Sequence, residues 1–246
     1  MKKACIWQFI ISFFLLNLMF GQLDNDSISL KKNKSELRLR LGIDLFQPII
    51  SQLDKDINGL ELVGDFQIKE NIYISGEIGT LNRNQQSELV NFKTSGSYIK
   101  IGGDFNMYKN WTGMNNQIYL GVRIANSLYK HNINNYILFA TEQVWNDNVI
   151  NSGYKTGEIK DLNAQWIEFL VGLKVQVVKN TYMGFSLRLN RLISTNSPND
   201  FGILFIPGFN RVTDDNIFGS SFNYTLSYSF PFRSSKKTNS YFFLFS

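Results

Sequence analysis

The stretch Phe222-Asn-Tyr-Thr-Leu-Ser-Tyr-Ser-Phe-Pro-Phe232 shows most directly which fold the chain adopts. Every second residue from Phe222 to Phe232 is aromatic or aliphatic, and the residues between them are small or polar up to Ser229. Successive side chains of a β-strand point to opposite faces, so a period of two predicts a strand with one apolar face. The stretch is therefore predicted to be a strand that separates an apolar environment from a polar one.

Seven further segments repeat this alternation. They are 37–45, 60–68, 72–79, 99–107, 118–125, 167–177 and 183–190. A tilted strand needs about 9–11 residues to cross a bilayer, and the segments are of about this length. We therefore predict an all-β chain with eight membrane-crossing strands.

The two faces of the segments differ sharply in charge. The apolar phase holds no charged residue, whereas the opposite phase carries Arg38, Arg40, Asp44, Glu61, Asp65, Lys69, Glu77, Lys100, Asp104, Arg123, Glu168, Lys174 and Arg188. These seven positive and six negative charges nearly cancel. Because charge is costly on a lipid-facing surface, the apolar phase is predicted to face lipid and the charged phase to face inward.

The connections between the segments alternate in length. Those near 70–71, 109–116 and 179–181 are short, and those near 47–58, 82–96, 130–164 and 193–217 are long. Short turns on one side and long loops on the other are typical of a closed, antiparallel, up-and-down outer-membrane β-barrel, whose ring of strands pairs every backbone group. The alternative is a soluble exported barrel or sandwich, in which the apolar faces would point inward. Aromatic residues near strand ends, among them Tyr129, Trp166 and Tyr182, fit the girdles at the two membrane interfaces.

The pattern over 37–232 and the stretch 223–232 resemble a known group of proteins. The chain is similar to the small outer-membrane β-barrel proteins of Bacteroidetes-type bacteria, with the architecture of OmpX, the OmpA barrel and the PorT-like proteins. Its stretch 223–232 is similar to the aromatic-ended terminal strand by which barrel proteins are recognised for assembly. The resemblance implies an outer-membrane location, the barrel-assembly machinery as a partner and no assigned activity. The chain departs from the group in continuing past this strand.

The two ends of the chain lie outside the alternating pattern. Lys2 and Lys3 precede an apolar stretch at 6–20, which predicts a secretory signal peptide at 1–21; a membrane-anchor helix is the alternative. We therefore divide the chain into the signal peptide, an N-terminal leader segment at 22–36, the barrel at 37–232 and a C-terminal tail at 233–246. The net charge of +5 falls when Lys2 and Lys3 leave, so no nucleic-acid partner is indicated.

A barrel of eight strands has an interior that side chains just fill. Apart from Lys69, we expect the charges given above to form a network of salt bridges that closes the lumen, because unpaired buried charge is costly. The alternative is an ion path or a proton relay through the same residues.

Two connecting stretches, 135–145 and 201–209, are too apolar for ordinary solvent-exposed loops. They could be two additional membrane strands, which would make a ten-stranded barrel. They could instead extend strands above the membrane or fold into the barrel mouth. A third interpretation is an exposed apolar patch for a partner or a lipid, with Tyr136, Phe139, Trp145, Phe205 and Phe209 as candidate contact residues.

Residues that carry chemistry are scarce in the chain. One cysteine excludes a disulfide scaffold, and one histidine, His131, makes a transition-metal site improbable, so no metal, cofactor or catalytic residue is predicted. We expect a non-catalytic outer-membrane barrel that contacts outer-membrane lipid and acts through its long loops on a surface or envelope protein, in binding, adhesion or envelope assembly. The alternatives are a lipid-modifying or proteolytic enzyme that uses His131, and a narrow transport channel.

Overall fold

The computed structural model of the chain describes residues 37–86, 90–108, 115–136, 157–196, 204–209 and 217–232. Within these ranges the elements are β1 (Leu37–Asp44), α2 (Phe46–Leu53), β2 (Ile57–Lys69), β3 (Ile72–Gln86), β4 (Val90–Asn106), β5 (Gln117–Tyr136), β6 (Gly157–Val178), β7 (Thr181–Thr195) and β8 (Phe218–Phe232). The predicted signal peptide, leader and tail lie outside the described residues.

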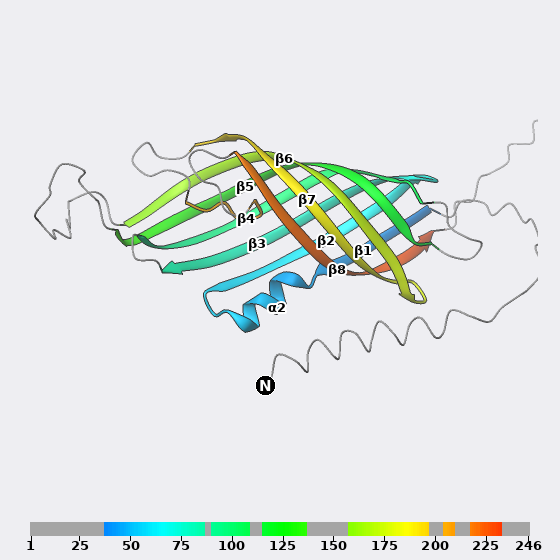
Figure 1. Cartoon of the computed structure of the whole chain (residues 1–246), viewed down its shortest axis with the longest axis horizontal. Helices are drawn as coiled ribbons and strands as arrows, with labels where there is room; N and C mark the ends of the chain where they lie inside the picture. The colour runs from blue at the N-terminus through cyan, green and yellow to red at the C-terminus, as the bar shows by residue number, and fades with distance from the viewer. Residues whose placement is uncertain are drawn as a thin grey trace, which may run out of the picture. The chain divides into compact units, whose positions relative to one another are not determined.

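The eight strands form one closed barrel in chain order (Figure 1). Each strand pairs antiparallel with its neighbours, and β1 closes the ring on β8 with Leu37 opposite Phe232 and Asp44 opposite Thr225. The predicted closed, antiparallel, up-and-down fold is confirmed. The ten-stranded alternative is wrong, since the ring closes with eight strands.

The apolar phase of the strands points outward and forms a belt around the barrel. Ile124 is 68% exposed and Leu189 is 67% exposed, although both are aliphatic. On β5 the belt runs from Ile118 to Leu128 and gives way to exposed Lys130 and Asn132. A water-soluble barrel requires the opposite arrangement, with its apolar side chains inside.

Strand lengths follow from where this belt ends. The longest strands, β5 and β6, have 20 and 22 residues, so they continue well beyond the apolar belt on the side of the long connections. β1 has only 8 residues and ends at Asp44. The wall of the barrel is therefore taller around β5 and β6 than at β1 (Figure 1).

The connection after β1, predicted as a long loop, contains the helix α2 instead. Its apolar residues Phe46, Ile49, Ile50 and Leu53 follow the spacing of one helical face. The Phe46 ring packs edge-on against Phe222 of β8 at 4.6 Å between ring centroids, which holds the helix beside the wall. No helix in the described ranges is long and apolar enough to cross a membrane.

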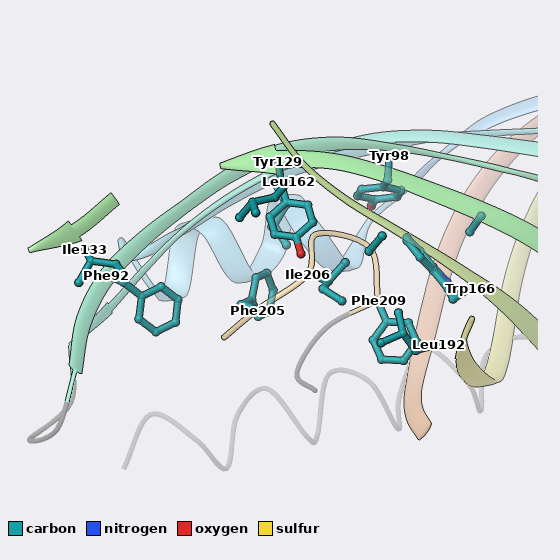
Figure 2. Packing of buried hydrophobic residues seen from close by; sticks show 13 residues of the cluster. Phe92, Tyr98, Tyr129, Ile133, Leu162, Trp166, Leu192, Phe205, Ile206 and Phe209 are labelled. Atoms are coloured by element: carbon teal, nitrogen blue, oxygen red, sulfur yellow. The ribbon is translucent and has the colours of Figure 1, made fainter. Parts of the chain in front are cut away.

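The inner loop, residues 204–209, folds back into the mouth of the barrel (Figure 2). Phe205, Ile206 and Phe209 are at most 2% exposed and pack among inward-facing residues of the strands. Those neighbours are Leu81, Phe92, Tyr98, Ala125, Tyr129, Ile133, Leu162, Ala164, Trp166 and Leu192. Of the three interpretations of 201–209, folding into the mouth is the one that the described residues support.

The burial of inward-facing aromatic side chains corrects two sets of predicted positions. Phe205 and Phe209 were candidates for partner contact, but both are buried in the mouth. Tyr129, Trp166 and Tyr182 were assigned to the interfacial girdles, but their side chains point inward and are at most 6% exposed. These inward-facing rings fill the interior above and below the charged layer. A narrow barrel accommodates such large side chains only where small residues lie opposite them.

Candidate functional site: a closed and charged lumen

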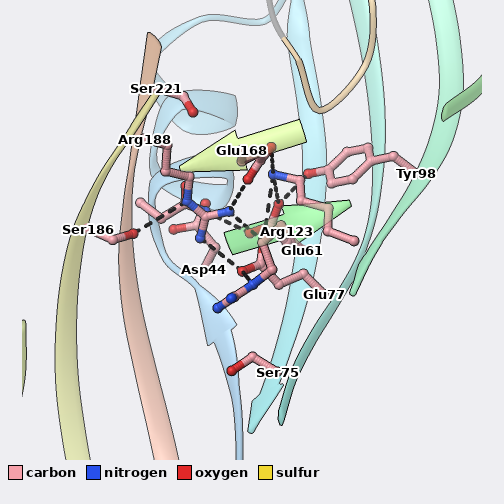
Figure 3. A network of polar contacts seen from close by, with 12 residues as sticks. Asp44, Glu61, Ser75, Glu77, Tyr98, Arg123, Glu168, Ser186, Arg188 and Ser221 are labelled. Atoms are coloured by element: carbon pink, nitrogen blue, oxygen red, sulfur yellow. Dashed lines mark hydrogen bonds and ion pairs between the residues drawn. The ribbon is translucent and has the colours of Figure 1, made fainter. Parts of the chain in front are cut away.

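A layer of charged side chains crosses the lumen of the barrel (Figure 3). Eleven of the twelve residues predicted for the network lie in this layer: Arg40, Asp44, Glu61, Asp65, Glu77, Lys100, Asp104, Arg123, Glu168, Lys174 and Arg188. All are buried except Lys174, whose side chain is 12% exposed. Arg38, near the start of β1, is half-buried and forms no ion pair with the described residues.

The part of the layer nearer the inner loop is centred on two cations. Arg188 donates two hydrogen bonds to the Glu77 carboxylate, at 2.6 and 3.0 Å, and a third to Glu168 at 3.1 Å. Lys100 lies among three carboxylates, with Nζ 3.2 Å from Glu168, 3.6 Å from Glu77 and 3.7 Å from Glu61. Paired donors of this kind are among the strongest polar contacts in proteins and fix the orientation of both partners.

Neutral side chains complete the hydrogen bonding of the same carboxylates. The Tyr98 hydroxyl donates to one oxygen of Glu61 at 2.7 Å, and the Asn223 amide donates to the other at 2.6 Å. The Trp166 indole N–H donates to Glu168 at 2.7 Å. Tyr98, Asn223 and Trp166 were not predicted for the network, although their inward phase on β4, β8 and β6 was a usable signal.

The part of the layer nearer the short turns is built around Asp65. Arg40 donates to one oxygen of Asp65 at 2.7 Å, and Lys174 lies 2.6 Å from the other. Arg40 also donates to Gln117 at 2.7 Å. Three tyrosine rings pack against these cations, with Tyr73 and Tyr182 against Arg40 and Tyr119 against Lys174, at 4.8–5.4 Å from charge to ring centroid.

Arg123 joins the two parts of the layer. Its Nη1 lies 2.8 Å from Asp104, and its Nε lies 3.6 Å from Glu77. Asp104 in turn accepts a hydrogen bond from Ser75 at 2.6 Å. Asp104 also lies 3.9 Å from Lys174, so the charges of the layer other than Asp44 form one connected network across the barrel.

The part of the network nearer the short turns leaves little empty space. The cavity between Arg40, Asp65, Arg123 and Arg188 has a volume of about 30 Å³. A cavity needs about 10–15 Å³ of such volume to hold one water molecule, so this cavity has room for only about two or three. In the described structure the lumen is closed twice, by the inner loop in the mouth and by the charged layer beneath it.

His131 lies on β5 beyond the apolar belt and is buried in the mouth. Its Nδ1 is 2.8 Å from the Thr94 hydroxyl, and its ring meets Phe92 and Tyr129 edge-on. Burial lowers the pKa of His131 to about 4. A neutral imidazole between a hydroxyl and two aromatic rings is typical of a packed core position.

The remaining predicted contact residues fall at or beyond the edge of the described structure. Tyr136 is the last residue of β5 and pairs with Val90. Phe139 and Trp145 lie outside the described residues. Among the described residues, no group of three or more His, Cys, Asp or Glu side chains is arranged to hold a metal ion.

A family model described as a domain of unknown function (DUF6048) matches residues 2–236. The chain belongs to the DUF6048 family. No curated protein matches this DUF6048 member in sequence. It is similar in structure to Ail, the attachment invasion locus protein of Yersinia pestis, with 11% identity and a TM-score of 0.41 over 80% of this chain and 100% of that one. It is also similar to Neisserial surface protein A, with 11% identity and a TM-score of 0.37 over 80% of this chain and 96% of that one.

Proposed function

We propose that the chain is an integral outer-membrane β-barrel without catalytic activity, which keeps its lumen closed and acts through its long loops. The outward apolar belt supports the membrane location, because such a surface is stable only against lipid. Export by the signal peptide at 1–21 and insertion by the barrel-assembly machinery belong to the same proposal.

The observation that carries the proposal is the filled lumen. A channel needs a continuous aqueous path, and here the space between Arg40, Asp65, Arg123 and Arg188 in the charged layer is only about 30 Å³. The five cations of the layer are each held by a carboxylate at 2.6–3.2 Å. The barrel then serves as a rigid scaffold that presents the connections 130–164 and 193–217, through which binding, adhesion or envelope assembly takes place.

Planar-bilayer conductance of the refolded protein tests the closed lumen. Folding is first verified by a heat-modifiable shift in gel mobility. We expect no stable single-channel steps at neutral pH, because ions cannot pass the charged layer without breaking several buried ion pairs. Stable steps of porin size would contradict the closed-lumen proposal.

The absence of catalysis is tested at His131. The variant His131→Ala is compared with the unchanged protein in assays of lipid A modification and of surface proteolysis. Since the ring is buried between Phe92 and Tyr129 and its one described polar partner is the Thr94 hydroxyl, with no carboxylate among its described contacts, we expect no difference. An activity that disappears with His131 would establish the enzymatic alternative.

A further inference from the structure

The barrel wall is incomplete where β1 ends. β1 pairs with β8 along residues 225–232 and with β2 along residues 62–66. β8 already begins at Phe218 and β2 at Ile57, so both neighbours extend past the end of β1. The last hydrogen bonds between this end of β1 and β8 run from the Leu45 N–H to the Tyr224 carbonyl at 2.7 Å and from the Tyr224 N–H to the Asp44 carboxylate at 3.1 Å. Beyond them, α2 lies where β1 would continue (Figure 1).

A cavity of about 280 Å³ occupies this position. It is lined by Phe46 and Ile50 of α2, by Phe222, which points outward from β8, and by Asn223, which points inward. A space that touches both faces of β8 at the end of β1 connects the lipid side of the wall with the interior. We call this cavity the lateral pocket.

Four charged side chains line the lateral pocket: Asp44, Glu61, Arg83 and Lys100. Glu61 and Lys100 compensate each other at 3.7 Å, and Lys100 is further compensated by two more carboxylates of the network. Asp44 and Arg83 form no ion pair with any other described residue. Among the described residues, the pocket therefore offers one charge of each sign that lies in no direct ion pair.

The carboxylate of Asp44 is only 1% exposed, and its contacts in the described structure are with neutral groups. One oxygen accepts the backbone N–H groups of Phe46 and Tyr224, each at 3.1 Å. The charged layer as a whole holds six carboxylates, including Asp44, against five cations. A buried carboxylate in excess attracts a cationic group, because ionised side chains are stable in an interior when a counter-charge is present.

The other lining groups of the pocket suit an apolar chain and an anionic group. Phe222 belongs to the lipid-facing belt and contacts Phe46, so the apolar rim of the pocket continues the belt. The Arg83 guanidinium lies over the Phe205 ring at 4.8 Å and can bind a phosphate, which arginine recognises well. Ser220 and Ser221 of β8 also line the pocket.

We propose that the lateral pocket binds the head group of a zwitterionic phospholipid from the surrounding membrane, with its ammonium at Asp44, its phosphate at Arg83 and its acyl chains along Phe222 and Phe46. This proposal rests on the proposed outer-membrane location. The volume of about 280 Å³ is slightly smaller than that of typical ligand pockets, which is about 300–1,000 Å³. It therefore suits a head group whose chains remain outside on the belt.

Lipid titration followed by native mass spectrometry tests the proposal. The refolded barrel in dodecyl maltoside is titrated separately with phosphatidylethanolamine and phosphatidylglycerol of the same acyl chains. We expect one tightly retained phosphatidylethanolamine and at least tenfold weaker retention of phosphatidylglycerol, which lacks the ammonium. Equal retention of the two lipids would overturn the proposal.

Variants then place the site. Asp44→Asn keeps the oxygen that accepts the two backbone N–H groups but removes the charge. The affinity for phosphatidylethanolamine is therefore expected to fall about tenfold, which corresponds to about 1.4 kcal/mol of binding free energy. Glu158→Gln, which removes a carboxylate paired with Lys130 and Lys160 at the exposed loop end, is the matched control and is expected to bind unchanged. An unchanged Asp44→Asn would contradict the assignment.

A second variant keeps the test valid if Asp44→Asn fails to fold. Ile50→Trp fills the lateral pocket from helix α2 and leaves every charge of the layer in place, and it is expected to abolish selective retention of phosphatidylethanolamine. Soluble glycerophosphoethanolamine serves as a third ligand: competition by it at the same concentrations as the lipid would show a site for a free head group rather than for a membrane lipid. Heat-modifiable mobility and outer-membrane fractionation of the same variants report separately on the proposed location.

Discussion

Individual glycines decide how the aromatic side chains fit inside the barrel. Glu61 of β2, Gly79 of β3 and Tyr98 of β4 lie side by side in register, and the Tyr98 ring passes over Gly79 to donate its hydroxyl to Glu61. A Cβ atom added at Gly79 would lie 2.4 Å from the Tyr98 ring. The absence of a side chain at Gly79 is therefore what allows the hydrogen bond between Tyr98 and Glu61.

Gly79→Ala is expected to destabilise the barrel. The added methyl displaces the Tyr98 ring, which costs about 1–3 kcal/mol for overpacking, and weakens the hydrogen bond to Glu61. Urea unfolding of the refolded protein in detergent measures the change. Gly76→Ala on the same strand is the control, since its nearest contact would be an ordinary one, 3.8 Å from the Lys100 carbonyl. Equal stability of the two variants would contradict the packing described for Tyr98.

The charged layer gives a second prediction for a single residue. Arg188→Met leaves the buried carboxylates Glu77 and Glu168 without their main cation, and removing one partner from a buried pair typically costs about 3–5 kcal/mol. Lys130→Met breaks the exposed pair with Glu158 and is expected to leave the unfolding midpoint within experimental error. The same urea unfolding curves compare the two, and similar losses from both variants would refute the structural importance of the layer.

Among the elements, β5 shows how the polarity of a strand's outward face changes along its length. Beyond Leu128 its outward face becomes polar, and its inward face carries the buried His131. Because burial lowers the pKa of His131 to about 4 from an ordinary value of 6.5, protonation favours the unfolded state. The contribution of the neutral ring to the free energy of unfolding is fully present above pH 6.5 and is lost as the pH falls toward 4. The total loss is about 3 kcal/mol.

This pH dependence is measured by unfolding at pH 7 and pH 4.5, in the unchanged protein and in His131→Gln. The unchanged protein is expected to lose more stability between the two pH values than the variant, because glutamine does not titrate. Other groups titrate equally in both proteins and cancel in the difference. Identical losses would show that His131 is not held in the neutral form.

The sequence predicted the elements well where lipid lies on one side of the strand. β8 was predicted at 222–232 and spans Phe218–Phe232, since its apolar phase faces lipid along most of its length. β6 was predicted at 167–177 but begins at Gly157. Its first residues stand beyond the belt, where the outward face is polar, so the alternation fades although the backbone pairing with β5 continues.

The helix α2 and the inner loop were harder to predict for different reasons. The apolar residues of α2 follow helical spacing, but only 8 residues carry it, which is too short a stretch to stand out between two strands. The inner loop is apolar because it fills the mouth, and its partners Tyr98, Trp166 and Leu192 come from three different strands. Such distant contacts depend on the barrel's closure, which local sequence does not contain.

For the whole molecule, composition and phase predict which charges enter the lumen but not how they pair. Arg188 and Glu77 are 111 residues apart in the chain, and Lys174 and Asp65 are 109 residues apart. These pairs meet because the stagger between strands sets which residues share a level across the barrel. The lateral pocket has the same origin, since it exists only because β1 is shorter than both of its neighbours.

The measurement that tests the central claim most directly is membrane fractionation of the expressed full chain combined with heat-modifiable gel mobility. The closed barrel with an outward apolar belt predicts that the protein is found in the outer-membrane fraction. It also predicts that an unheated sample migrates differently from a boiled one, because the closed barrel resists detergent until it is heated. Recovery in the soluble periplasmic fraction with no mobility shift would contradict the account.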